Sequence, residues 1–439
     1  MENNRLFLLY MELAHQCIQV LDKNWKGRFT IPSPRLYPFQ WNWDSGFIAL
    51  GNLHHKPERA LTEMEALFSG QWKNGFLPHI IFHNAEKYSS YFPSADYWNS
   101  GVSEEAPADL KTSGITQPPV HGFILEELFK AGLDIQRISE LFNKVSSYHQ
   151  WLYQYREYES TGLVAIWHNW ESGMDNSPWW DIPLERITLD ELEYIQLERK
   201  DVHEVKESES TRPKDLDYKR YLYLVDTLRE HKYSGIPDDF PFQILDPVFN
   251  SILLASTESL IRLGKVLNKD TDWLSQKLNQ GTESFDVYFL DDEQDLYFPY
   301  DLVGREQLKQ PCSGSYIPIF AGIPSLARVQ RMLKPNREQT QIRPFPSCHP
   351  EGVGFEQKNY WRGPVWVNMN WLIWKGLLNY HLSGEAELVK NQTIGMVKEY
   401  GIFEYFNPFT DNQSGTGYGG ADFSWTAALV LDMINKTTS

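Results

Sequence analysis

Cysteine is scarce in this sequence. Its three cysteines, Cys17, Cys312 and Cys348, lie far apart and form no CxxC pair. A sparse, odd set of this kind excludes a disulfide framework and is typical of reduced thiols in a cytosol. No apolar run is long enough to cross a bilayer. Residues 1–5 lead into an amphipathic segment without the hydrophobic core of a signal peptide. We therefore expect a cytoplasmic protein with no membrane partner.

Positive charge is also in short supply. The 439 residues include 41 Lys and Arg against 58 Asp and Glu, which gives a formal net charge of −17. Since no basic face is then available to neutralise phosphates, we expect no nucleic-acid partner.

Several chemical signatures are missing as well. The 12 histidines show neither HxH nor HExxH spacing, and no GxSxG occurs. Gly415, Gly417 and Gly420 match the spacing GxGxxG, but no strand–helix–strand pattern surrounds them. We therefore expect no metal and no cofactor.

Strand-like runs are few, which excludes a (β/α)8 barrel with its eight Val/Ile-rich strands. Apolar side chains instead recur at helical spacing. The predicted helices are 6–21, 45–53, 60–68, 122–130, 135–153, 218–228, 247–267, 272–285, 324–332, 364–381, 385–400 and 423–434. Segment 294–300 could form a short hairpin arm. Helices in such a series, joined by long loops, predict an all-α fold, an (α/α)6 barrel of paired inner and outer helices.

No linker, repeat or low-complexity tail divides the chain, so we expect one domain over residues 1–439. The charged stretch at about 184–214 has the composition of a linker. It lies between two motif-bearing loops, so we interpret it as a mobile insertion near the functional site.

Aromatic residues are abundant, with 16 Trp, 23 Tyr and 24 Phe. Residues 167–181 alone contain four tryptophans and three carboxylates, and Gly and Pro break any helical or strand period there. Flat indole faces beside carboxylates suit a ligand with an apolar face and a hydroxylated rim, such as a sugar ring. The alternative is a core loop whose acids cap neighbouring helices.

Other loops share this character. Trp41, Trp43 and Asp44 precede a helix, where Asp44 could grip sugar hydroxyls or simply cap the helix. Glu404 is flanked by aromatic residues, and we expect an apolar setting that strengthens it as a proton acceptor. Arg212 is either paired at the surface with Asp215 or Asp217 or, if it points inward, available to a substrate carboxylate.

Five of these motifs occur in the order used by glycoside hydrolase family 63, which the chain resembles from about residue 30 onward. They are WDS at 43–45, WESGMDNSP at 170–178, YWRGP at 360–364, EY at 404–405 and FSWT at 423–426. The resemblance implies an (α/α)6 barrel and inverting hydrolysis of α-glycosides. The compact members of this family, which this chain is similar to, hydrolyse mannosylglycerate and glucosylglycerate.

The resemblance also implies roles for individual residues. Asp175 matches the general acid and Glu404 the general base, and inversion requires roughly 6.5–9.5 Å between such carboxyls. The sugar-contacting positions map onto Tyr37, Trp41, Trp43, Asp44 and Gln117. The glycerate-binding positions map onto Arg212, Tyr218 and Tyr88, with Tyr360 and Trp361 close by. One departure is the run 417–420, which lacks the polar side chain expected beside the glycerate.

Two other functions remain open at this point. The enzyme could act on a neutral α-disaccharide or oligosaccharide, and an inward-pointing Arg212 would favour the anionic substrate instead. A non-catalytic sugar-binding protein would not need both Asp175 and Glu404 in one pocket. A homo-oligomer is compatible with a protein of this size.

Overall fold

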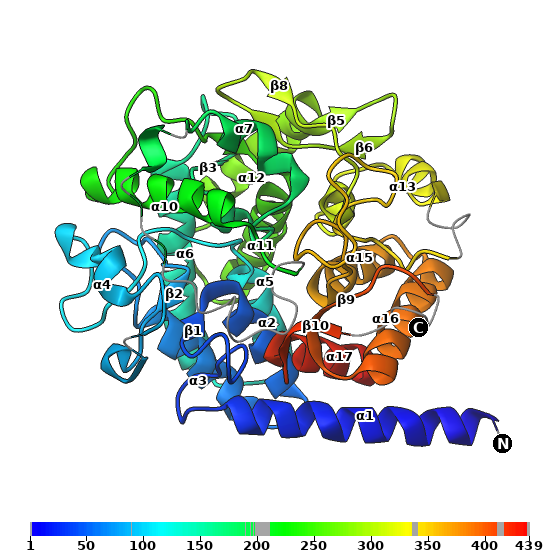
Figure 1. Ribbon diagram of the computed structural model, residues 1–439. Coiled ribbons are helices and arrows are strands. Elements are labelled where there is room, and N and C mark those ends of the chain that lie inside the picture. Colours follow the sequence, from blue (N-terminus) through cyan, green and yellow to red (C-terminus); the bar gives the residue numbers. More distant parts are fainter. Residues whose placement is uncertain are drawn as a thin grey trace.

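Helices dominate the computed structural model, which describes residues 2–88, 90–188, 190–193, 195, 197, 211–335, 341–410 and 417–436 (Figure 1). Every helix predicted from the sequence is confirmed, with bounds that differ by a few residues. The helices are α1 (Glu2–Asn24), α2 (Asn42–Leu53), α3 (Pro57–Phe68), α5 (His121–Lys130), α6 (Ile135–Tyr155), α10 (Asp215–Glu230), α11 (Pro247–Val266), α12 (Asp272–Phe289), α13 (Leu326–Met332), α15 (Val367–Asn379), α16 (Ser383–Tyr400) and α17 (Ser424–Asn435). Two short helices, α4 (Ala95–Trp98) and α7 (Asp181–Glu185), lie in loops.

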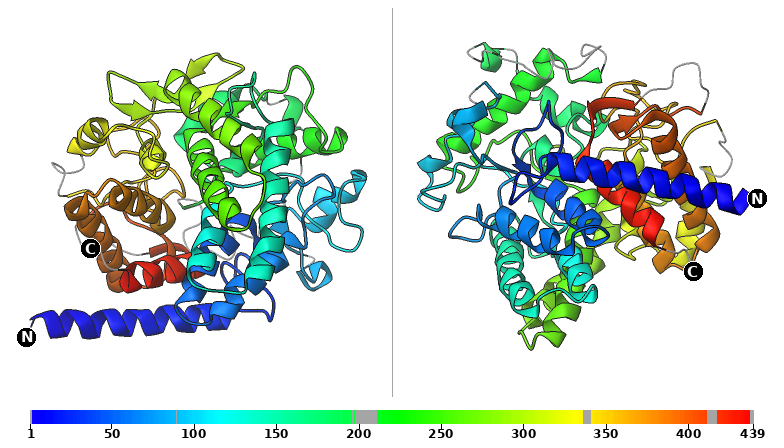
Figure 2. Two further views of the ribbon diagram at one scale, coloured as in Figure 1. Left: turned by 180° about the vertical axis from the view of Figure 1, so that it is seen from behind. Right: turned by 90° about the horizontal axis from the view of Figure 1, so that it is seen from below.

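The inner helices form a closed ring. Helix α2 packs on α5, α5 on α11, α11 on the 3-10 helix η6 (Ser313–Ile319), η6 on α15, α15 on α17, and α17 on α2 again. An outer layer covers them, in which α1 packs on α17, α3 on α2, α6 on α5, α12 on α11 and α16 on α15. Figure 2 shows this layering from behind and from below. The predicted (α/α)6 barrel is confirmed.

Burial distinguishes the two layers. Helix α2 is buried continuously from Asn42 to Asn52, and α17 from Ser424 to Met433. In contrast, α6 buries one face, because its apolar residues recur every three or four positions. Helix α1 lies along α17 at the edge of the barrel, so the first and last helices of the chain are neighbours (Figure 1).

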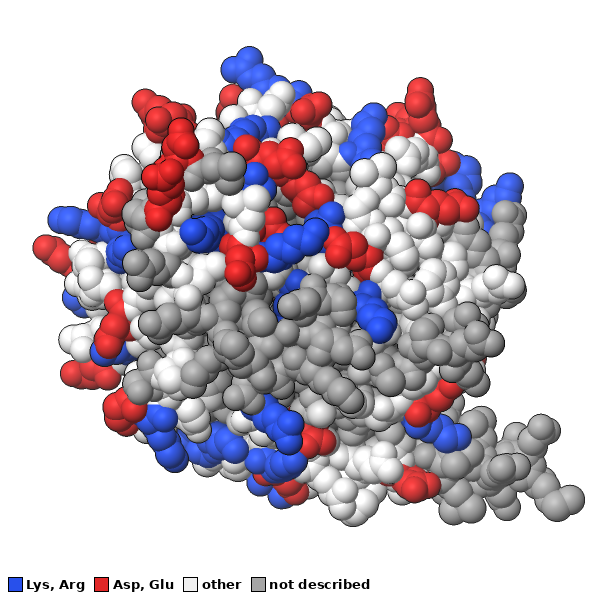
Figure 3. Space-filling view, in the orientation of Figure 1, with Lys and Arg blue, Asp and Glu red and all other residues white. Residues whose placement is uncertain are grey.

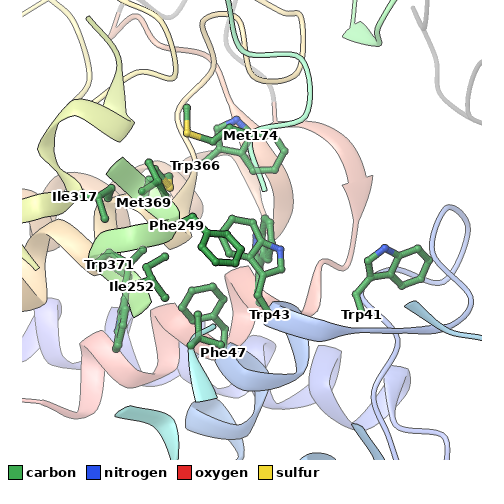
Figure 4. Close-up of a cluster of buried hydrophobic side chains, with 14 of the residues drawn as sticks. Trp41, Trp43, Phe47, Met174, Phe249, Ile252, Ile317, Trp366, Met369 and Trp371 are labelled. Atoms are coloured by element: carbon green, nitrogen blue, oxygen red, sulfur yellow. The ribbon is translucent and has the colours of Figure 1, made fainter. Parts of the chain in front are cut away.

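Large apolar side chains fill the centre of the ring. Figure 4 shows Trp43 and Phe47 of α2 beside Phe249 and Ile252 of α11, Ile317 of η6, and Met369 and Trp371 of α15. Trp366, Trp371 and Trp374 are each at most 1% exposed and belong to this core.

Short paired strands lie in the loops that connect the helices. Strand β1 (Gln40–Trp41) pairs with β2 (Ile80–Ile81), and β9 (Phe403–Phe406) with β10 (Gly417–Ala421). A four-stranded sheet has the order β3 (Ala165–Ile166), β4 (Ile244–Leu245), β7 (Tyr300–Asp301), β8 (Glu306–Gln307). The hairpin expected at 294–300 begins earlier, since β5 (Leu290–Asp291) pairs with β6 (Leu296–Tyr297).

The insertion expected at about 184–214 is only partly described. Residues 184–188, 190–193, 195, 197 and 211–214 belong to the described part, and residues 189, 194, 196 and 198–210 lie outside it. The single domain and the mobile insertion therefore stay predictions.

Candidate active site

A cavity of about 250 Å³ brings together all the residues predicted for the site. Its lining includes both carboxylates, Asp175 and Glu404, although 229 positions separate them in the chain. The other predicted residues that line it are Tyr37, Trp41, Trp43, Asp44, Tyr88, Gln117, Arg212, Tyr218, Tyr360 and Trp361.

Three of the residues predicted to contact a sugar lie at the start of α2 or directly before it. Trp41 ends strand β1, and Trp43 and Asp44 lie in the first turn of the helix. The N-cap residue is Trp41, which makes no side-chain cap, so the alternative that Asp44 serves as the helix cap is wrong. Burial, reinforced by the charge of Glu404, raises the pKa of Asp44 well above its usual range. The side-chain oxygen of Gln117 accepts a hydrogen bond of 3.3 Å from the backbone N–H of Trp43.

Asp175 lies in the turn between the 3-10 helices η3 (Asn169–Ser172) and η4 (Pro178–Trp180). The amide of Asn169 donates a hydrogen bond of 2.6 Å to the Asp175 carbonyl and fixes this turn. Burial and then the nearby charge of Glu404 raise the pKa of the Asp175 carboxyl to about 7. A carboxyl with this pKa holds its proton near neutrality, as a general acid requires.

Glu404 lies on β9 and is 1% exposed. Its Oε1 accepts a hydrogen bond of 2.8 Å from the Tyr37 hydroxyl, and its Oε2 accepts one of 2.9 Å from the backbone N–H of Gly420. Arg212 lies 3.2 Å from the same Oε2. The expected apolar setting is therefore wrong. Strand alternation turns the Glu404 side chain away from Phe403 and Tyr405, and donors distant in sequence surround the carboxylate.

Arg212 points inward and is 4% exposed. Its Nη1 donates to the Tyr37 hydroxyl over 2.9 Å, and its guanidinium lies 4.7 Å from the centre of the Tyr360 ring. The alternative of a surface pairing with Asp215 or Asp217 is wrong for Arg212. The cavity thus contains a cation beside the carboxylate of Glu404, and Asp175 and Asp44 lie in the same lining.

Aromatic rings complete the walls. Trp361 stacks on Trp366 with 3.8 Å between ring centres, and this buried pair supports Tyr360. Tyr88, at the end of the 3-10 helix η1 (Ala85–Tyr88), packs edge-on against Phe39. Tyr218, in the first turn of α10, packs edge-on against Trp170.

The cavity also contains residues that the sequence reasoning did not assign to the site. Trp170, Phe423 and Trp425 belong to the quoted motifs, so their position in the sequence could have indicated them. His79 and Trp98 carry no such signal. His79 lies 2.6 Å from the Ser113 hydroxyl through Nδ1, and burial keeps its pKa well below the usual range.

Within the described part of the chain, no three His, Cys, Asp or Glu side chains gather as a metal site would need. The helices described there include none that is long and apolar enough to cross a membrane.

Comparison with known proteins places the chain in a family. Residues 37–426 match the model of the mannosylglycerate hydrolase MGH1-like glycoside hydrolase domain. A mannosylglycerate hydrolase of Thermus thermophilus is 39% identical over 425 residues, which cover 95% of this chain and 99% of the relative. A glucosylglycerate hydrolase of Mycolicibacterium hassiacum is 30% identical over 448 residues, 96% of this chain and 98% of the relative.

A solved structure agrees over the same length. The family 63 mannosylglycerate hydrolase from a second strain of Thermus thermophilus, in complex with Tris and D-glycerate, matches with a TM-score of 0.87 and 38% identity. The match covers 96% of this chain and 99% of that structure. The chain therefore belongs to the MGH1-like glycoside hydrolases of family 63.

Proposed function

We propose that this glycoside hydrolase cleaves mannosylglycerate or glucosylglycerate to the free sugar and glycerate, with inversion at the anomeric carbon. One observation carries the proposal: the buried cation of Arg212 lies in the same cavity as the carboxyls of Asp175 and Glu404. Relatives named for each of the two substrates match almost the whole chain, and D-glycerate is bound in the similar solved structure.

Asp175 acts as the general acid in this proposal. Because its pKa is about 7, it is protonated below neutrality and can donate that proton to the glycosidic oxygen. Glu404 acts as the general base and takes a proton from the water that attacks the anomeric carbon from the opposite face. We expect roughly 6.5–9.5 Å between the two carboxyls, which leaves room for this water.

The remaining side chains divide between the two halves of the substrate. The sugar side consists of Tyr37, Trp41, Trp43, Asp44 and Gln117. Indole faces pack on the sugar ring, and the carboxylate, amide and phenol bind its hydroxyls. The aglycone side consists of Arg212, Tyr88, Tyr218, Tyr360 and Trp361. Arg212 binds the glycerate carboxylate there through charge-assisted hydrogen bonds.

A neutral α-disaccharide is the second candidate substrate, and the buried guanidinium argues against it. A neutral aglycone would give Arg212 no anion besides Glu404, so the charge-assisted hydrogen bonds of Arg212 would not contribute to substrate binding. A sugar-binding protein without catalysis would have no use for the Asp175 carboxyl, which is protonated near neutrality beside the charge of Glu404.

The surroundings of the enzyme are part of the proposal. We expect a cytoplasmic enzyme without metal, cofactor or nucleic-acid partner, and a homo-oligomer is compatible with a protein of this size. The described part of the face in Figure 3 intersperses acidic with basic side chains, unlike the continuous basic surface that nucleic acids require. Chelation with EDTA should leave activity unchanged, and light scattering will give the oligomeric state.

The experiment is an assay of sugar release from mannosylglycerate, glucosylglycerate and kojibiose. NMR spectra recorded in the first minutes should show the β-anomer of the released sugar, because inversion of an α-glycoside produces it. Asp175→Asn and Glu404→Gln should each reduce kcat on the order of 10²–10⁴-fold while the circular dichroism spectrum stays unchanged. Release of the α-anomer, or substantial activity in either variant, would contradict the proposed mechanism.

A further inference from the structure

A series of polar contacts runs from Glu404 through the hydroxyls of Tyr37 and Tyr360 towards Asp175. The Tyr37 hydroxyl contacts Oε1 of Glu404 at 2.8 Å and the Tyr360 hydroxyl at 3.4 Å. Tyr360 in turn interacts with the Asp175 carboxyl and lowers its pKa. The contacts therefore run in the order Glu404, Tyr37, Tyr360, Asp175. All four residues line the same cavity.

The proposed inverting reaction, on which this inference rests, leaves the enzyme in the wrong protonation state. Asp175 gives its proton to the leaving glycerate oxygen, and Glu404 gains one from the attacking water. A second turnover requires Asp175 to be protonated and Glu404 to be ionised again. One proton must therefore leave Glu404 and one must reach Asp175 in every cycle.

Direct exchange of the Glu404 proton with bulk water is hindered. The Glu404 side chain is 2% exposed, and its two oxygens already contact Tyr37, Arg212 and the backbone of Gly420. The hydroxyl of Tyr37 is the partner of Glu404 that can both accept and donate a proton. A guanidinium and a backbone N–H can only donate.

We propose that Tyr37 and Tyr360 return the proton from Glu404 to Asp175 after each turnover. Glu404 transfers its proton to the Tyr37 oxygen, Tyr37 transfers its own to the Tyr360 oxygen, and Tyr360 transfers its own to the Asp175 carboxylate. One O–H bond breaks and one forms at each phenol, so both phenols end neutral. The net change is one proton moved from Glu404 to Asp175.

The surroundings of the two phenols suit this role. Burial raises the pKa of both Tyr37 and Tyr360 well above the usual range, so each keeps the proton that it must pass on. The guanidinium of Arg212 lies 5.8 Å from the centre of the Tyr37 ring and 4.7 Å from that of Tyr360. Its charge stabilises the negative charge that develops on each phenol oxygen during transfer. The 3.4 Å contact between the hydroxyls is long for a hydrogen bond, so transfer across it is slower than across the 2.8 Å contact between Tyr37 and Glu404.

The test compares the first turnover with later ones in Tyr37→Phe and Tyr360→Phe. The proton returns after the glycosidic bond is cleaved. Loss of this transfer should therefore lower kcat by about 10- to 100-fold and slow the first turnover less. Rapid-quench experiments should then show a burst of roughly one equivalent of sugar per active site. Imidazole, a small proton carrier, should raise kcat of both variants with its concentration, at constant pH and ionic strength, and leave kcat/KM unchanged.

Tyr405→Phe is the matched control. It also removes a buried phenol, 5.5 Å from the Tyr360 ring, but that hydroxyl donates to the Thr211 carbonyl and contacts neither catalytic carboxyl. We expect neither a burst nor an imidazole effect for this variant.

Two results would overturn the proton return. Either kcat stays unchanged in both phenylalanine variants, or kcat and the first turnover fall equally without an imidazole effect. In the second case the phenols only position the carboxyls. Failure of the proposed function is a separate outcome, because the unmodified enzyme would then release no sugar from either glycerate glycoside.

Discussion

Arg212 and Glu404 form an ion pair inside the cavity, with 3.2 Å between Nη2 and Oε2. Their side chains are 4% and 2% exposed, so each charge depends on the other for compensation in a poorly hydrated place. The same guanidinium contacts Tyr37 and lies over Tyr360. One cation therefore serves the general base and the region where the aglycone is expected.

This double role predicts a specific kinetic pattern for Arg212→Gln. The variant should lower kcat for every substrate, because Glu404 loses its cation. It should raise KM about 10- to 100-fold more for a glycerate glycoside than for the neutral glycerol glycoside, since a hydrogen bond to a charged group contributes about 1.5–3 kcal/mol. Arg212→Lys should keep part of the difference in KM between the charged and the neutral substrate. Equal changes in KM for both substrates would show that Arg212 does not bind the carboxylate.

The pKa of Asp175 predicts how activity depends on pH. Burial and the charge of Glu404 raise this pKa to about 7, so the acid is protonated below pH 7 and loses its proton above it. The value of kcat/KM should therefore fall as the pH rises through about 7. Arg212 lowers the pKa of Asp175, so Arg212→Gln should move this alkaline limb to higher pH and Arg212→Lys should leave it in place. If the alkaline limb of the pH profile stays in place in Arg212→Gln, this limb belongs to a group other than Asp175.

A second buried ion pair, between Arg156 and Glu171, should matter for stability. Its two N–O distances are 2.9 and 3.0 Å, and both side chains are at most 4% exposed. Glu171 also accepts the backbone N–H groups of Thr116 and Trp167, which joins the Gln117 loop to the loop of Asp175. Glu171→Gln should lower the free energy of unfolding in urea by about 3–5 kcal/mol, because Arg156 stays buried without its partner.

Asp295→Asn provides the comparison for that variant. It breaks the pair between Asp295 and Arg331, whose side chains are 24% and 52% exposed. Solvent screens such a pair, so the loss should stay below about 1 kcal/mol. If Glu171→Gln and Asp295→Asn lower the free energy of unfolding equally, the buried pair contributes no more to stability than the exposed one.

Outer helices such as α6 could be predicted from the sequence because burial of one face imposes a helical period on their apolar residues. The sixth member of the inner ring could not. Helix η6 contains Pro318 and Gly314, which interrupt the helical pattern, and its place between α11 and α15 depends on closure of the ring. Closure of the ring depends on contacts between distant segments, and the local spacing of apolar residues gives no information about such contacts.

The site residues could be named because their motifs resemble those of family 63, yet the groups that surround each side chain could not be predicted. Glu404 follows an aromatic residue in sequence, but its carboxylate meets Tyr37, Arg212 and Gly420, three groups from distant segments. His79 enters the cavity beside Trp98 without any motif, through the backbone pairing of β1 with β2. The resemblance of the motifs to family 63 therefore indicated which side chains belong to the cavity, and the fold decides their electrostatic environment.

Asn176, directly after Asp175, ties the acid to the aromatic wall. Its Nδ2 donates to Asn359 over 2.9 Å, and its Oδ1 accepts the backbone N–H of Trp361 over 2.8 Å. Asn176→Ala leaves that buried N–H unpaired, which should cost about 1–3 kcal/mol of stability. It also frees Asp175 to shift against Trp361, and a displacement of this kind should lower kcat/KM by up to about 100-fold.

A variant that loses a buried hydrogen bond away from the cavity separates the effect on stability from the effect on kcat/KM. Asn370→Ala removes a buried hydrogen bond of 3.0 Å to Thr393 between α15 and α16, away from the cavity lining. We expect this variant to lose comparable stability, measured by urea unfolding, and to keep its kcat/KM. If Asn176→Ala behaves in the same way, the clamp between the acid loop and Trp361 contributes to folding alone, because the acid would then hold its position without Asn176.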